Sequence, residues 1–305
     1  MQHIISSKEL SKDKIESILN RSKEMEEACK KGTVEPILKD KIVACIFFEP
    51  STRTRLSFET ASLKLGAQVI SAENAETNSS AYKGETIEDT TKILSSYADI
   101  IVIRHHTAGM LLRASKVSNK PVINAGDGAN EHPSQALLDL YTIQKEHGRL
   151  DNLTIAFGGD LTHSRTLHSL VPLLTLYPNN TFYFISPKEL ALPKEYTDSL
   201  QKNGVNFKEM NTLKDGLKDA DILYMTRVQK ERFENAEDYE KVKDLFILKK
   251  EHLAEMKKNA IIMHPLPKIN EIELEVDSDP RASYFRQAEN GLYVRMAMLE
   301  YVLKG

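Results

Sequence analysis

The sequence places arginine and hydroxyl side chains directly after several of its short apolar segments. EPSTRTR (49–55) follows the apolar run 41–48, and Arg104, Arg165 and Arg227 lie just beyond three other such runs. A guanidinium group can hold carboxylate or phosphate oxygens through two parallel hydrogen bonds. We therefore expect a site for ligands that carry several negative charges.

The segment Ser51 to Arg55 makes the most specific of these suggestions. It follows a predicted strand and begins a predicted helix, whose first N–H groups lack intrahelical acceptors and whose dipole end is positive. Ser51, Thr52 and Thr54 add hydroxyl groups, and Arg53 adds a cation. The P-loop pattern GxxxxGK[ST] is absent. The segment therefore suits a phosphate, with an ordinary helix start and surface arginines as the alternative.

Histidines offer a second kind of chemistry. His132 precedes a predicted helix, where its imidazole could polarise a carbonyl oxygen or simply cap the helix. His264 lies between an apolar segment and two prolines, and we expect it to be packed and hydrogen-bonded. Two histidine pairs, His105-His106 and His163/His168, could suggest a metal site. Neither pair matches the zinc-binding pattern HExxH, so we expect no metal there.

Short apolar segments alternate with helical patterns along the whole chain. Their hydrophobicity is continuous rather than alternating, which is typical of parallel strands covered on both faces. Ligands of open parallel sheets bind beyond the carboxyl ends of the strands, so this architecture would bring the polar segments together. The predicted strands are 41–48, 68–72, 99–103, 121–125, 153–159, 180–186, 205–209, 220–226 and 259–263.

Helical patterns separate these strands into two sets. Phe58, Ala61 and Leu65 predict a helix after the first strand, and Pro133 to His147 predicts another between the two sets. A last amphipathic stretch, 286–304, has no strand after it. We expect an α/β protein of two doubly wound domains, each with a mainly parallel sheet flanked by helices, joined by a linker helix.

Composition narrows the class of protein. The 305 residues are 41% apolar and 28% charged, and the formal net charge of −3 argues against a nucleic-acid or membrane-surface protein. The two cysteines, Cys29 and Cys45, have no ligand-like spacing, so we expect neither a disulfide framework nor a zinc site. The N-terminus lacks a signal-peptide pattern and no apolar run could span a bilayer, so we expect a cytoplasmic protein.

Six motifs together resemble the catalytic chains of aspartate carbamoyltransferase, in the aspartate/ornithine carbamoyltransferase superfamily. The resemblance covers essentially the whole chain, in family order and at family spacing. The motifs are FFEPSTRTRLSFE (47–59), KGET (83–86), NAGDG (124–128), HPSQALLDL (132–140), RVQKER (227–232) and HPLP (264–267).

The resemblance implies a role for each matching residue. The phosphate of carbamoyl phosphate would be held by Ser51, Thr52, Arg53 and Thr54. Its carbonyl oxygen would be contacted by Arg104, His132 and Thr54, and its amide by Gln135 and the backbone of Pro265 and Leu266. The carboxylates of aspartate would be bound by Arg165, Arg227 and Gln229. A neighbouring subunit would supply Lys83 and either Ser79 or Ser80, with family spacing favouring Ser79.

From the same resemblance we expect transfer of the carbamoyl group to L-aspartate, a step of pyrimidine biosynthesis, without a cofactor or a metal. The catalytic groups would be Arg53, Thr54, Lys83, Arg104 and His132. The working unit would be a homotrimer with shared active sites, and separate regulatory chains or a dihydroorotase partner stay open. The implied domains are 1–133 plus 286–305 for carbamoyl phosphate, 134–148 as linker helix, and 149–285 for aspartate.

Three places depart from the family pattern: His106 where proline is common, Thr162-His163-Ser164 where Lys-Tyr-Gly is common, and Lys268 where arginine is common. Two alternatives remain. Ornithine carbamoyltransferases usually have HCLP where this chain has Pro265, and an SMG loop where it has RVQKER. Arg165 and Arg227 would also repel a diamino acid. A catalytically silent anion-binding paralogue is disfavoured because the matching polar residues are intact.

Overall fold

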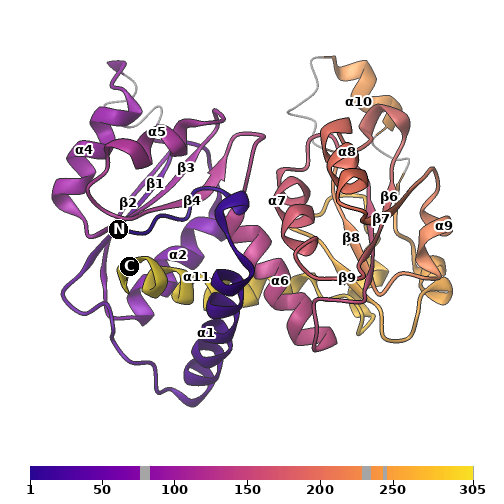
Figure 1. Cartoon of the computed structure of the whole chain (residues 1–305), viewed down its shortest axis with the longest axis horizontal. Helices are drawn as coiled ribbons and strands as arrows, with labels where there is room; N and C mark the ends of the chain where they lie inside the picture. Colours follow the sequence, from indigo (N-terminus) through magenta and orange to yellow (C-terminus); the bar gives the residue numbers. More distant parts are fainter. Residues whose placement is uncertain (76–82, 229–234, 243–245, 305) are drawn as a thin grey trace. The chain divides into compact units, whose positions relative to one another are not determined.

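A computed structural model describes residues 1–75, 83–228, 235–242 and 246–304 of the chain (Figure 1). The chain divides into two compact units. Unit 1 comprises residues Met1–Tyr141 and Glu289–Gly305, and unit 2 comprises Thr142–Ala288. The boundaries fall within two helices, α6 (Pro133–His147) and α11 (Tyr284–Lys304).

Unit 1 is built on a four-stranded parallel sheet in the order β2-β1-β3-β4. Its strands are β1 (Ile42–Phe47), β2 (Gln68–Glu73), β3 (Ile100–His105) and β4 (Val122–Asp127). The helices α4 and α5 lie on one side of this sheet and α1, α2 and α11 on the other (Figure 1). The helical segments of unit 1 include η1 (Ser7–Glu9), α1 (Lys12–Lys31), α2 (Thr52–Lys64), α4 (Ile87–Tyr97) and α5 (Met110–Val117). The first part of α6 and most of α11 also belong to this unit.

The N-terminal segment extends this sheet at its β4 edge. The Ile4 N–H donates to the Val122 carbonyl at 3.0 Å, and Ile4 accepts from the Asn124 N–H at 2.8 Å. Ser7 donates to the buried Glu131 carboxylate through both its N–H and its hydroxyl, each at 2.6 Å. The first residues therefore fasten the connection that leads from β4 to α6.

Unit 2 is built on a five-stranded parallel sheet in the order β7-β6-β5-β8-β9. Its strands are β5 (Thr154–Gly158), β6 (Thr181–Ile185), β7 (Asn206–Met210), β8 (Ile222–Met225) and β9 (Ile261–Met263). The helical segments between the strands are α7 (Arg165–Leu174), η3 (Lys188–Leu190), α8 (Lys194–Lys202), α9 (Leu213–Leu217), α10 (Ala236–Val242) and η5 (Lys250–Glu255), and η6 (Leu274–Ser278) follows β9.

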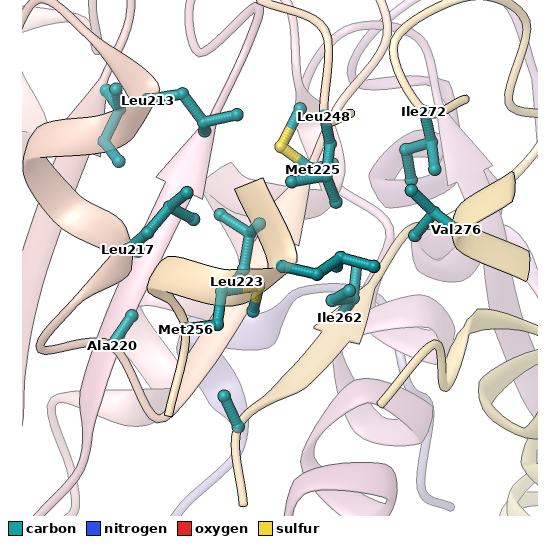
Figure 2. Packing of buried hydrophobic residues seen from close by; sticks show 14 of the residues in the cluster. Leu213, Leu217, Ala220, Leu223, Met225, Leu248, Met256, Ile262, Ile272 and Val276 are labelled. Atoms are coloured by element: carbon teal, nitrogen blue, oxygen red, sulfur yellow. The ribbon is translucent and has the colours of Figure 1, made fainter. Parts of the chain in front are cut away.

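Apolar side chains from several elements form the core of unit 2 on one face of this sheet (Figure 2). Leu223 of β8 and Ile262 of β9 lie at its centre, and Leu217 of α9 packs beside them. Ile272 and Val276, which follow the HPLP segment in the chain, insert into the same cluster. The segment after β9 is therefore anchored to the core at its far end.

All nine predicted strands are present, as are the helix after the first strand, the helix Pro133–His147 and the last helix. The prediction that every strand is covered on both faces was wrong for β2 and β7, whose residues are mostly exposed or half-buried. Both are edge strands, which have fewer neighbours to cover them. Among the described residues, no helix is long and apolar enough to cross a bilayer.

Candidate active site

The carboxyl ends of three neighbouring strands in unit 1 carry the residues that we expect around carbamoyl phosphate. β1 leads to Thr54, β3 contains Arg104 as its last residue but one, and β4 leads to His132. These three side chains are 6%, 7% and 5% exposed, so each is fixed by its surroundings. Because β1, β3 and β4 are adjacent in the sheet, the topology brings these polar groups to one edge.

The segment expected to bind phosphate begins helix α2. The helix starts at Thr52 with Ser51 as its N-cap residue, and the Ser51 side chain makes no capping hydrogen bond. The first turn contains no acidic residue, and Thr52 and Arg53 are exposed. Arg55 points to two carboxylates instead, at 2.9 Å from Glu59 and 3.0 Å from Glu73. An anion at this helix start would therefore meet backbone N–H groups, hydroxyls and Arg53.

Arg104 is held by groups from two other strand ends. Its Nη2 lies 2.8 Å from the Glu49 carboxylate after β1, and its Nη1 donates to the Ala125 carbonyl of β4 at 3.3 Å. Gly126 makes room for this guanidinium, because a Cβ there would lie 2.7 Å from Arg104 Nη1. Gly126 also has φ +133°, which side-chain-bearing residues rarely adopt. The NAGDG motif therefore shapes the Arg104 position.

His132 and Gln135 lie at the start of α6. His132 Nδ1 is 3.2 Å from the Ser134 hydroxyl, an arrangement that directs Nε2 away from the helix. The His132 carbonyl accepts from the Gln135 N–H at 3.0 Å, so both residues belong to the same first turn. The Gln135 amide donates from Nε2 to the buried Asp139 carboxylate at 2.9 Å. The Ser134 hydroxyl can donate to or accept from His132 Nδ1, so this contact fits a ring that donates from Nε2.

Unit 2 places its expected site residues in the same way. Arg165 begins α7 after β5, Arg227 follows β8, and Pro265 and Leu266 follow β9. The strands β5, β8 and β9 are neighbours, and all four residues are half-buried. This edge therefore offers two guanidinium groups and a turn of backbone to a ligand.

The turn after β9 is held by a buried histidine. His264 is 1% exposed and accepts from the Leu266 N–H through Nδ1 at 2.8 Å. Its Nε2 lies 2.7 Å from Oε1 of Glu271, which also accepts from the Ile269 and Asn270 N–H groups. Although burial disfavours the Glu271 charge, the contact with His264 and the backbone N–H groups lowers the pKa of that carboxyl. The expectation of a packed, hydrogen-bonded His264 is confirmed.

Leu266 itself adopts φ +55°, in the left-handed region that leucine rarely enters. Its side chain packs against the unit 2 core. The His264 bond and this packing together hold a strained backbone in place, and such strain is common at binding sites.

Two of the expected site residues, Ser79 and Gln229, lie outside the described residues, so their positions stay predictions. Lys83 is described and exposed. An exposed lysine on unit 1 is compatible with a role in a neighbouring subunit's site.

The three departures from the family pattern have local partners. The His106 ring stacks on that of His105, with the ring centroids 4.4 Å apart. His163 Nδ1 lies 3.0 Å from the buried Asp160 carboxylate, and Lys268 lies 3.1 Å from Asp277. These contacts hold the polypeptide near the site and leave the expected ligand-binding residues in place.

His168 Nε2 donates to the Leu161 carbonyl at 3.1 Å, and its ring stacks on that of Tyr196. Within the described ranges, no group of three or more histidine, cysteine, aspartate or glutamate side chains could hold a metal ion.

Sequence reasoning missed the residues that hold the site from behind: Glu49 beside Arg104, Asp139 beside Gln135, and Glu271 beside His264. Two of these residues had a signal in the sequence. Glu49 and Asp139 lie inside the motifs 47–59 and 132–140, and Asp139 is one helical turn after Gln135, a spacing that puts both on one helix face. Glu271 has no such signal, because a loop separates it from its partner.

Comparison with known proteins agrees with this geometry. Residues 2–145 match the carbamoyl-phosphate-binding domain of aspartate/ornithine carbamoyltransferases, and residues 151–302 match the aspartate/ornithine-binding domain. The chain therefore belongs to the aspartate/ornithine carbamoyltransferase family.

Within that family, the chain is similar over its whole length to several aspartate carbamoyltransferases. The chain is 48% identical to the catalytic subunit of the Methanocaldococcus jannaschii enzyme over 304 residues, which cover 100% of this chain and 98% of that one. It is 46% identical to the chloroplastic enzyme of Arabidopsis thaliana, over 100% of this chain and 78% of the relative. The resemblance drawn from the motifs is confirmed.

Solved structures agree on the fold. The M. jannaschii catalytic subunit superimposes with a TM-score of 0.92 at 48% identity, covering 100% of this chain and 98% of that chain. The aspartate transcarbamoylase of Trypanosoma cruzi in complex with carbamoyl phosphate and aspartate gives 0.91 at 36% identity, covering 98% and 95%. The expected α/β fold with two parallel sheets is confirmed.

Proposed function

We propose that this chain transfers the carbamoyl group of carbamoyl phosphate to the amine of L-aspartate, giving N-carbamoyl-L-aspartate and phosphate. The observation that carries the proposal is the gathering of Thr54, Arg104 and His132 at the ends of β1, β3 and β4. Full-length relatives named aspartate carbamoyltransferase support the same reaction. The step belongs to pyrimidine biosynthesis.

The phosphate of the substrate binds at the start of α2. Ser51, Thr52 and Thr54 offer hydroxyls, and Arg53 offers a bidentate cation. The first-turn N–H groups and the positive end of the helix dipole favour the same anion. The absence of an acidic residue from this turn removes a competing charge.

The carbonyl oxygen of the substrate receives hydrogen bonds from Arg104, His132 and Thr54. When the aspartate amine attacks the carbamoyl carbon, negative charge develops on this oxygen. One well-placed donor to such an oxyanion is typically worth about 3–4 kcal/mol of barrier. The half-buried Glu49 beside Arg104 holds the guanidinium in place before the substrate arrives.

Aspartate is bound by unit 2 through Arg165, Arg227 and Gln229. Both arginines follow strands of unit 2, and a guanidinium suits each of the two carboxylates. The backbone of Pro265 and Leu266, together with Gln135, contacts the carbamoyl amide. The leaving phosphate accepts the amine proton, so the reaction uses no nucleophilic side chain of the protein.

The assay that tests this reaction follows two products. Incubation with carbamoyl phosphate and aspartate should yield carbamoyl aspartate, whereas ornithine should yield no citrulline. Citrulline formation would identify an ornithine carbamoyltransferase instead. Formation of neither product would identify an anion-binding paralogue without this activity.

We propose further that the working unit is a cytoplasmic homotrimer in which Ser79 and Lys83 of one subunit complete a neighbour's site. α2 and β2 support this, because their Leu56, Leu63 and Ile70 are 46%, 61% and 39% exposed. A subunit interface on these elements would cover such apolar side chains. The native mass tests the trimer and also detects regulatory chains that copurify.

Complementation tests the shared site. Lys83→Gln and Arg53→Ala homotrimers should each be nearly inactive. Reassembly of the mixed chains should restore part of the activity, because some sites then combine an intact Lys83 with an intact Arg53. Mixed trimers as inactive as the parents would exclude a shared site.

A further inference from the structure

A cation is buried in the middle of unit 1. Arg295 of α11 is 4% exposed, and its guanidinium carbon lies 5.2 Å from the centre of the Phe58 ring of α2. Gly291, one turn earlier in α11, leaves the space that the guanidinium occupies, because a Cβ there would lie 2.2 Å from Arg295 Nη1. A buried charge is costly unless an opposite charge accompanies it.

Asp139 of α6 supplies that opposite charge. It is 0% exposed, and its negative charge favours the charged form of Arg295. Burial lowers the pKa of Arg295 to about 10, so the guanidinium stays protonated at neutral pH. A buried guanidinium stabilises a carboxylate near it in the charged form.

An ionised Asp139 determines which way the Gln135 amide faces. A carboxylate can only accept hydrogen bonds, so the group that faces it at 2.9 Å must be the Gln135 Nε2 amide. The amide oxygen Oε1 is thereby turned away from Asp139. A neutral partner at position 139 could donate as well as accept, and the amide could then face either way.

This orientation matters for one substrate group. The amino group of carbamoyl phosphate can only donate hydrogen bonds here, so it needs an acceptor such as Oε1. We propose that Asp139, with Arg295 as its buried counter-charge, is a positioning residue that presents Gln135 Oε1 to that amino group. The inference rests on the proposed function, since it takes Gln135 as the contact of the carbamoyl amide.

Acetyl phosphate tests the proposal, because it carries a methyl group where carbamoyl phosphate carries the amino group. The KM for carbamoyl phosphate and the inhibition constant of acetyl phosphate are measured on the intact protein and on Asp139→Asn. We expect Asp139→Asn to raise the KM about tenfold and to change the inhibition constant less than about twofold. Asp139→Asn should cause no further loss in a Gln135→Met background.

Asp221→Asn is the matched control. Asp221 is also a buried aspartate, and it accepts from the Thr154 N–H at 2.9 Å. Neither constant should move in this variant. A purely structural role for Asp139 would weaken both ligands together, and that result would overturn the proposal. If the unaltered protein formed no carbamoyl aspartate, that result would instead refute the proposed function.

Asp139→Asn leaves Arg295 without its counter-charge and could prevent folding. Asp139→Asn combined with Arg295→Met removes both buried charges together, which is tolerated far better than removing one. This double variant should show the same selective loss of carbamoyl phosphate affinity. Unchanged discrimination between the two acyl phosphates in the folded double variant would equally overturn the proposal.

Discussion

Replacing His264 with asparagine or with glutamine separates the two contacts of this buried ring. The amide of asparagine lies near the position of Nδ1 and can still accept from the Leu266 N–H, which is 2.8 Å from Nδ1. The amide of glutamine reaches toward the position of Nε2 and can still contact Glu271, 2.7 Å away. Each variant therefore keeps one contact and loses the other.

The structure gives the expected size of each loss. A buried N–H without an acceptor costs about 1–3 kcal/mol, and this cost falls on Leu266 in the glutamine variant. Glu271 is better protected in the asparagine variant, because it still accepts from the Ile269 and Asn270 N–H groups. We expect both variants to lose about 1–2 kcal/mol in the free energy of unfolding.

Steady-state kinetics should then distinguish the variants. If the Leu266 bond positions the turn that meets the carbamoyl amide, His264→Gln should raise the KM for carbamoyl phosphate about tenfold. His264→Asn should change that KM less than about threefold at a similar loss of stability. Equal KM values for the two variants, or the reverse order, would refute the assignment of this turn to the substrate.

Three other predictions follow from the site. Gly126→Ala should lower kcat/KM for carbamoyl phosphate about tenfold by displacing Arg104, whereas Gly148→Ala, also at positive φ but with open space around it, should alter stability alone. Arg227→Ala should raise the KM for aspartate far more than that for carbamoyl phosphate, and equal increases would contradict the division of roles. Glu271→Gln should flatten the acid side of the stability curve. The pKa of Glu271 lies below 4.5, so its contribution is present above that pH and is lost as the pH falls through the lowered pKa.

The fold was predictable because its strands are short, apolar and buried, and because parallel strands need helices between them. Pro133 and Gly148 bracket α6 in the sequence as they do in the structure. The burial of the edge strands was harder to predict, because β2 and β7 have strand-like residue types but partly exposed faces. Exposure depends on neighbours that the local sequence does not specify.

The residues expected to contact the ligand were predictable for a different reason. Arg104 lies near the end of β3 and His132 in the connection that follows β4, so the sheet topology determines their neighbours. The residues that support the site from the interior could not be predicted. Arg295 and Phe58, for example, come together from helices that are far apart in the chain. Only tertiary packing brings such residues into contact.

The discontinuity of unit 1 has a consequence for the order in which the newly made chain can assemble. Residues Thr142–Ala288 form one uninterrupted unit, whereas the other unit needs both the first 141 residues and the segment that begins at Glu289. The second unit made on the ribosome is therefore the first that can be finished. Helix α2 must await Arg295 before its Phe58 ring is covered, so the carbamoyl phosphate site becomes complete only after the segment that begins at Glu289 has been made.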